Sequence, residues 1–292
     1  MQKVEIAIIG GSGLSEIEGM RVIDEVEIET PFGKPSDRIT VAEYSGRRVA
    51  FLPRHGHGHV IPPTRVPYAA NMWALKSLGV FWVITFSAVG SLNGEMAPEH
   101  FVIPDQIIDR TRHRVDTFFD DVVVHASFAY PFNAQLRAVL LEACRAEGVT
   151  THDHGTYECM EGPAFSTRAE SELYRSWHAD LVGMTAIPEA KLALEAEMAY
   201  ATVAQVTDYD CWLDQVVTVD DVLSHMRKNV ANVHRVIQRL IPMIPLGTEA
   251  ENPASHALAC AITTDVKRIG EDLREKYELL LGKYVDFGGH RK

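Results

Sequence analysis

The chain has 292 residues, of which 46 % are hydrophobic and 23 % are charged, and its formal net charge is −12. This length and composition are typical of a large globular domain and argue against a disordered or fibrous chain. An acidic chain without a Lys/Arg run lacks the basic face that nucleic acid requires, so we expect no nucleic-acid partner.

Hydrophobic periodicity predicts strands that alternate with helices. In chain order, the predicted elements are a strand at 4–9, a hairpin of strands 39–44 and 48–53, a helix at 66–76, a strand at 80–86, a helix at 136–147 that ends at Gly148, helices that begin at Thr167 and Pro188, a strand at 199–206, and helices at 219–241, 254–263 and 266–281. Thr167 and Glu170 have the spacing of a capping box. This alternation predicts an α/β fold, a single domain whose central mixed, mostly parallel sheet is flanked by helices.

The four cysteines show neither CxxC spacing nor the Cys/His spacing of a zinc site, which predicts free thiols in a reducing compartment. No apolar run is long enough to span a bilayer or to form the core of a signal peptide. We therefore expect a cytoplasmic protein with no membrane partner. The short basic cluster at 110–114 is interpreted as a solvated loop or a subunit contact.

Several clusters of polar or small residues directly follow predicted strands, where ligands of open α/β sheets usually bind. These clusters are residues 10–13, 54–55, 87–91 and 207–210. A fifth cluster, at 183–185, stands just before a predicted helix. We therefore expect the five clusters to converge on one site.

Three of these clusters have the chemistry of an anion site. Glycines at 10–13 can expose backbone N–H groups next to the hydroxyl of Ser12, although an ordinary turn is an equal alternative. Arg54 can grip a phosphate with two parallel hydrogen bonds and is expected to be an exposed cleft side chain. Thr185 stands at a helix start, where free N–H groups favour anions, or it is simply a helix cap. His55, His57 and His59 invite a metal, but no carboxylate is close in sequence and Arg54 would repel a cation.

Two carboxylates, Asp208 and Asp210, follow the last predicted strand. In an extended chain both would face the same side, and such a pair can satisfy ring nitrogen N7 and the 6-amino group of an adenine. The alternative is a solvated loop. Phe165 can stack on a base or belong to the core.

These clusters, in this order, resemble the trimeric purine nucleoside phosphorylase family. The resemblance extends from residue 7 to about residue 223. The motifs that carry it are 7–14, 30–37, 54–56, 71–76, 161–163, 168–171, 184–185 with 188–189, and 207–212. The sequence departs from the family pattern at Gly183, Ala164 and Ser87, where asparagine, arginine and threonine are common. Gly183 also occurs in a branch that acts on methylthioinosine.

The resemblance implies roles for individual residues. The implied phosphate-binding residues are Ser12, Arg54, His55, Ser87, Ala88 and Thr185. The implied substrate-binding residues are Phe165, Met184, Asp208, Tyr209 and Asp210, with Asp208 as the catalytic acid. The implied specificity residues are Ser166, Val219, Val222, Leu223 and His125, the last reaching in from a neighbouring subunit.

The resemblance further implies the phosphorolysis of S-methyl-5′-thioadenosine to adenine and 5-methylthioribose 1-phosphate, in purine and methionine salvage. Inorganic phosphate is then the co-substrate, and neither a metal nor an organic cofactor is expected. The implied organisation is a nucleoside phosphorylase domain at 1–245, a helical C-terminal extension at 246–292 packed on it, and a homo-oligomer, either a trimer or a dimer of trimers. Two alternatives stay open: a phosphorylase for adenosine, inosine, guanosine or methylthioinosine, and a non-catalytic nucleoside-binding protein.

Overall fold

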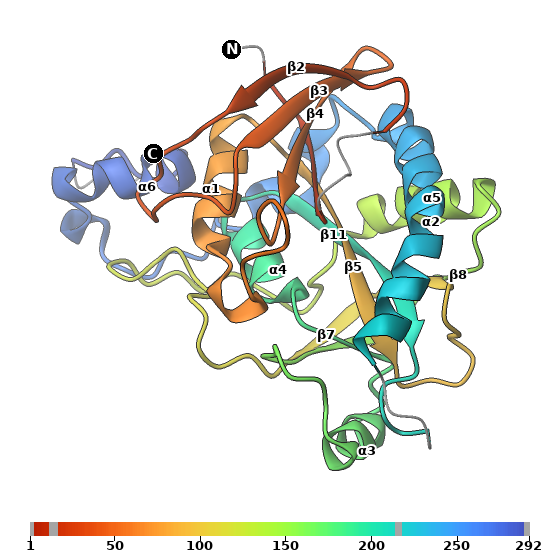
Figure 1. Cartoon of the computed structure of the whole chain (residues 1–292). Helices are drawn as coiled ribbons and strands as arrows, with labels where there is room; N and C mark the ends of the chain where they lie inside the picture. The colour runs from red at the N-terminus through yellow and green to blue at the C-terminus, as the bar shows by residue number, and fades with distance from the viewer. Residues whose placement is uncertain (1–2, 12–16, 214–217, 289–292) are drawn as a thin grey trace.

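The structure is a computed structural model that describes residues 3–11, 17–213 and 218–288, and an 11-stranded sheet forms its centre (Figure 1). The strands are β1 (Ile6–Gly10), β2 (Arg21–Val26), β3 (Ile39–Tyr44), β4 (Arg47–Pro53), β5 (Trp82–Ser91), β6 (Phe101–Val102), β7 (Gln106–Asp109), β8 (Thr151–His152), β9 (Thr156–Cys159), β10 (Leu181–Gly183) and β11 (Ala199–Asp208). The helices are α1 (Tyr68–Ser77), α2 (Ala134–Ala146), α3 (Arg168–Ser176), α4 (Ala186–Glu195), α5 (Val219–Met243) and α6 (Arg274–Leu281).

The sheet is mixed, with parallel pairs at its centre. Its main path runs β2-β3-β4-β1-β5-β10-β9-β7, while β11 pairs with β5 and β6, and β6 also pairs with β8. The β4–β1, β1–β5 and β5–β11 pairs are parallel, whereas β2–β3, β3–β4, β5–β10 and β6–β11 are antiparallel. This confirms the predicted α/β fold with a mixed, mostly parallel sheet.

Strand β1 shows why helices cover both faces of the sheet. All five of its residues are buried, and successive side chains point to opposite faces. Ala7 and Ile9 pack in one core with residues of α1 and α4, whereas Ile6 and Ile8 pack in another with residues of α2 and α5. Figure 1 shows these helix pairs on opposite sides of β5.

Local patterns predicted several features correctly. The hairpin joins β3 to β4 through Ser45 and Gly46, both with positive φ. Helix α3 begins at a complete capping box of Thr167 and Glu170. Gly148, with φ of 72°, follows the end of α2 as a left-handed residue that stops the helix.

Strands β5 and β11 extend further than predicted. The expected ends were residues 86 and 206, but β5 continues to Ser91 and β11 to Asp208. The two strands remain paired over this stretch, with Ala204 opposite Ser87 and Asp208 opposite Gly90. The small and polar residues of this stretch therefore remain in strands, because their backbone groups are still paired with the neighbouring strand.

The C-terminal part is less helical than predicted. It forms short 3₁₀ turns at Glu249–Glu251, Pro253–His256, Val266–Arg268 and Glu271–Leu273, with α6 as its only α-helix among the described residues. The N–H of Thr263 donates to the carbonyl of Val123 at 3.0 Å, so this segment pairs with another chain segment instead of continuing a helix. Leu258 and Tyr277 are buried in the same core as Ala7. The division at residue 245 stays a prediction.

No helix of the described residues is long and apolar enough to cross a membrane.

Candidate functional site

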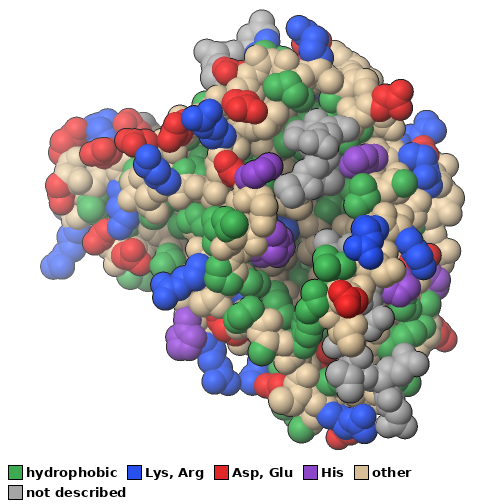
Figure 2. Space-filling model, in the orientation of Figure 1, with side chains coloured by type: hydrophobic (Ala, Val, Ile, Leu, Met, Phe, Trp, Pro, Cys, Tyr) green, Lys and Arg blue, Asp and Glu red, His purple; other side chains and the backbone are tan. Residues whose placement is uncertain are grey.

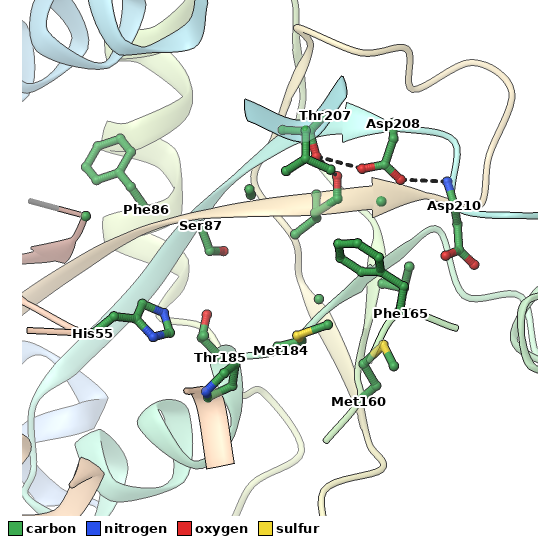
Figure 3. A pocket seen from close by; sticks show the side chains of 18 of the residues that line it. His55, Phe86, Ser87, Met160, Phe165, Met184, Thr185, Thr207, Asp208 and Asp210 are labelled. Carbon is green, nitrogen blue, oxygen red and sulfur yellow. Dashed lines mark hydrogen bonds between the residues drawn. The ribbon is translucent and has the colours of Figure 1, made fainter. Parts of the chain in front are cut away.

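A pocket of about 260 Å³ lies where the chain leaves the carboxyl ends of β1, β4, β10 and β11 (Figure 3). Most of the predicted site residues meet there. Those that line it are Arg54, His55, Ser87, Ala88, Phe165, Ser166, Met184, Thr185, Asp208, Asp210 and Val222. The expected convergence of separate clusters on one site is therefore confirmed, with Gly11 contributed by the first cluster.

Four of the predicted residues that the structure describes are not among those that line this pocket. Ser12 lies outside the described residues. His125 is exposed, and its N–H donates to the carbonyl of Ala261 at 2.9 Å. Val219 and Leu223 are 60 % and 42 % exposed, on the same helix as Val222. Tyr209 packs its ring edge-to-face against Trp212.

Arg54 follows β4 and is 2 % exposed, which contradicts the expectation of an exposed side chain. Its Nε and Nη2 donate to the two carboxylate oxygens of Glu189 on α4, at 2.5 and 3.1 Å, and its Nη1 donates to the carbonyl of Phe86 at 3.1 Å. The hydroxyl of Tyr200 donates to the same carboxylate at 3.0 Å. Burial acts to lower the pKa of Arg54, but the adjacent Glu189 more than offsets this and raises it, so the guanidinium stays charged.

His55 is a neutral side chain beside this cation. Its Nδ1 donates to the carbonyl of Ile61 at 2.8 Å, which leaves Nε2 as an acceptor. Burial and, next, the charge of Arg54 lower the pKa of His55 to about 4. Within the described part of the chain, no group of three or more His, Cys, Asp and Glu side chains is placed to hold a metal ion.

Thr185 precedes α4, but its side chain makes no capping hydrogen bond to that helix. The interpretation as a simple helix cap is therefore wrong. Thr185 is 7 % exposed, and it lines the pocket together with Ser87 and Ala88 from β5. A hydroxyl freed from capping is available to a ligand at the start of the helix, where unpaired N–H groups favour an anion.

Asp208 and Asp210 lie at the end of the pocket opposite to His55 and Thr185, as Figure 3 shows. Asp208 accepts hydrogen bonds from the Thr207 hydroxyl and from the N–H of Asp210, both at 2.8 Å. Asp210 has φ of 49°, so the chain turns there and the expected extended arrangement is wrong. Burial raises the pKa of Asp208, which favours its protonated form.

Gly90 makes this arrangement of acids possible. A Cβ atom at that position would lie 2.9 Å from Oδ1 of Asp208 and 3.3 Å from Cβ of Asp210. A side chain there would displace the carboxyl groups from the sheet edge. No pattern in the sequence indicates this contact, because it depends on the pairing of β5 with β11.

Arg114 anchors the apolar wall of the pocket. Its side chain is 1 % exposed, which contradicts its interpretation as part of a solvated loop or subunit contact. It donates to the carbonyls of Met184 at 2.6 Å, Ile187 at 2.5 Å and Glu161 at 2.7 Å. These bonds connect the two segments that carry Met184 and Phe165.

Sequence reasoning missed other residues of the site. Met160 and Val182 line the pocket, and Glu189 holds Arg54 from behind. Glu189 stands at a predicted helix start and in one of the motifs of the family resemblance, but no role in the site was expected for it. The pattern contained no indication that this acid is buried.

Charges on the face drawn in Figure 2 are interspersed, with Lys and Arg side chains next to Asp and Glu side chains. Neither sign of charge dominates this face, so an anion entering the pocket would have to be attracted by local groups such as the guanidinium of Arg54.

Comparison with known proteins agrees with this geometry. The family model of the phosphorylase superfamily matches residues 5–242. The S-methyl-5′-thioadenosine phosphorylase of Synechocystis sp. is 49 % identical over 290 residues, covering 97 % of this chain and 89 % of the relative. That of Geobacter sulfurreducens is 48 % identical over 284 residues, covering 96 % and 99 %.

Solved structures extend the agreement to the fold. A methylthioadenosine phosphorylase from an antarctic soil metagenomic library is 44 % identical, with a TM-score of 0.90 and coverage of 96 % of this chain and 100 % of the other. The methylthioadenosine phosphorylase of Schistosoma mansoni in complex with adenine is 34 % identical, with a TM-score of 0.85 and coverage of 89 % and 99 %. The chain therefore belongs to the phosphorylase superfamily.

Proposed function

We infer that this protein catalyses the phosphorolysis of S-methyl-5′-thioadenosine, releasing adenine and 5-methylthioribose 1-phosphate. Relatives that carry this activity in their names match nearly the whole chain at close to half identity. The observation that carries the inference is one pocket with a cation and hydroxyls at one end and two acids at the other. A protein that only sensed a base would have no use for the first end.

We propose that phosphate binds between Arg54, His55, Ser87, Ala88 and Thr185. Arg54 supplies the positive charge, and Nε2 of neutral His55 accepts a hydrogen bond from a phosphate hydroxyl. Glu189 fixes the guanidinium plane by binding two of its N–H groups. The glycosidic bond breaks towards a cationic sugar, and a phosphate held below that sugar serves as counter-charge and nucleophile.

The two acids at the other end of the pocket assist the departure of the base. We propose that Asp208, whose pKa is raised by burial, donates a proton to N7 as the glycosidic bond breaks. Asp210 accepts from the 6-amino group, Phe165 stacks on the base and Met184 contacts the ribose. Tyr209 is proposed to support this pair from outside the pocket, since its ring packs on Trp212.

The 5′-methylthio group requires an apolar surface. We propose that Val222 contacts it, with Ser166 beside it and with Val219 and Leu223 exposed on the same helix face. These two exposed valine and leucine side chains would become buried by substrate and by a neighbouring subunit.

We propose a homotrimer, or a dimer of trimers, in which His125 of one subunit completes the pocket of the next. The segment around His125 supports this, because Val123 is 53 % and Tyr130 is 85 % exposed. Light scattering at assay concentration should give a trimer or a hexamer, and His125→Ala should lower kcat/KM for the nucleoside. A fully active monomer would contradict the proposal.

We further propose that phosphate is the only co-substrate, that no metal or organic cofactor takes part, and that the protein works in the cytoplasm without a membrane or nucleic-acid partner. Cysteines support a reducing compartment: Cys144 and Cys159 are buried free thiols, and Cys211 and Cys260 are also unpaired.

The deciding experiment measures base release from methylthioadenosine, adenosine, inosine and methylthioinosine, each with and without phosphate. We expect phosphate-dependent release of adenine, fastest from methylthioadenosine. Faster release from an inosine form would identify a different phosphorylase. Binding without any release would identify a nucleoside-binding protein.

A further inference from the structure

Tyr157 and Gly183 occupy one space behind the phosphate end of the pocket. Tyr157 lies on β9 and Gly183 at the end of β10, two paired parallel strands. A Cβ atom built on Gly183 would lie 1.9 Å from the hydroxyl oxygen of Tyr157 and 2.5 Å from Cζ. Gly183 lines the pocket, so the phenol reaches the back of the pocket wall only because residue 183 has no side chain.

The hydroxyl of Tyr157 ends there without a hydrogen-bond partner in the part of the chain that the structure describes. Tyr157 is fully buried, and among the described residues neither its Oη nor the buried Oγ of Ser87 has a hydrogen-bond partner. The Ser87 hydroxyl and the backbone of Thr185 lie close enough to this phenol to act on it, and both act to lower its pKa, although neither is placed as a full hydrogen-bond partner. Burial nevertheless raises the pKa of Tyr157, so the hydroxyl keeps its proton and remains a donor.

Two unpaired buried hydroxyls side by side are unfavourable for the folded state, because each loses its bonds to water. A phenylalanine would fill the same space without that penalty. The arrangement is explained if a ligand completes it. Ser87 lines the pocket, and a phosphate oxygen there would accept a hydrogen bond from the Ser87 hydroxyl, which leaves the lone pairs of Oγ available to Tyr157.

We propose that Tyr157 is a positioning residue for phosphate: its hydroxyl donates to Oγ of Ser87 and so directs the Ser87 proton at the bound phosphate. Gly183 provides the room for this contact. The proposal rests on the proposed function, since it needs phosphate to be the co-substrate. No bond is made or broken in this step; only the two hydroxyl hydrogens are oriented.

Tyr157→Phe tests the proposal, because it removes the hydroxyl and keeps the ring. We expect the KM for phosphate to rise about tenfold, equivalent to about 1.4 kcal/mol. The KM for methylthioadenosine should stay within about twofold, and the melting temperature should stay the same or rise because an unpaired buried hydroxyl is lost. A matched control is Tyr277→Phe, which removes a buried hydroxyl bonded to Asp121 at 3.0 Å, away from the pocket. It should lower the melting temperature and leave both KM values unchanged.

A double-mutant cycle with Ser87→Ala identifies the route of the effect. If Tyr157 acts through Ser87, adding Tyr157→Phe to Ser87→Ala should change the KM for phosphate by less than about twofold. An unchanged phosphate KM in the single variant, or a full tenfold effect in the Ser87→Ala background, would overturn the proposal. A wild-type protein that releases no adenine with phosphate would overturn the proposed function instead, so the two failures are distinguishable.

Discussion

Replacing Arg54 by alanine tests the buried ion pair and the phosphate site together. The substitution leaves the carboxylate of Glu189, which is 1 % exposed, with the Tyr200 hydroxyl as its only hydrogen-bond partner among the described residues. Breaking a buried pair by removing one member costs about 3–5 kcal/mol, because the remaining charge is uncompensated. For a chain of this size we expect a fall in melting temperature on the order of 10 °C. Replacing Arg54 should therefore lower stability much more than replacing an exposed arginine would.

The companion variant separates stability from function. Adding Glu189→Gln to Arg54→Ala removes the unpaired charge, so we expect it to recover on the order of 2 kcal/mol of the loss. It cannot restore phosphate use, because the guanidinium is still absent. Thermal unfolding and kcat/KM for phosphate, measured on both variants and the wild type, provide the two readouts.

Two results would refute this reasoning. If Arg54→Ala melts like the wild type, the pair with Glu189 does not contribute as a buried ion pair. The second result is a double variant that regains stability and also has the wild-type KM for phosphate. Arg54 would then have no part in phosphate binding and would serve only to compensate the buried charge of Glu189.

Four further predictions concern the choice of base, the pocket acid Asp208, the apolar wall and the buried Glu158. The wild type should prefer 6-amino over 6-oxo nucleosides by at least about a hundredfold in kcat/KM. Asp208→Asn should lose roughly a hundredfold on methylthioadenosine, and an unchanged ratio to methylthioinosine would exclude Asp208 as the reader of the base. Val222→Thr should shift the kcat/KM ratio about tenfold from methylthioadenosine towards adenosine, whereas equal losses would indicate a packing role. Glu158 is buried with no hydrogen-bond partner for either oxygen among the described residues, and burial raises its pKa to about 8. Because the folded state then binds this proton more tightly than the unfolded state, stability should fall as pH rises from about 4.5 to about 8, by on the order of 5 kcal/mol. Glu158→Gln should lose this part of the pH dependence of the melting temperature, and parallel curves for the two proteins would contradict it.

Local chemistry in the sequence was sufficient for the fold class and for the choice of candidate clusters. The apolar run of β1, the turn at Ser45 and Gly46 and the capping box at Thr167 depend on neighbours a few residues away, so they are readable from the chain. The order of small and polar clusters after strands also predicted their convergence on one pocket, because the ends of parallel strands meet at one edge of the sheet.

Contacts between distant segments were decided only by the tertiary structure. Arg54 and Glu189 are 135 residues apart, and this pair forms only because the fold brings α4 beside the residue that follows β4. The turn at Asp210, the anchoring of Met184 by Arg114 and the room that Gly183 leaves for Tyr157 are likewise set by packing. A short stretch of sequence shows the propensity and polarity of each residue. It does not show which distant residue will compensate a buried charge or hydroxyl, because that partner depends on how the helices and the sheet pack together.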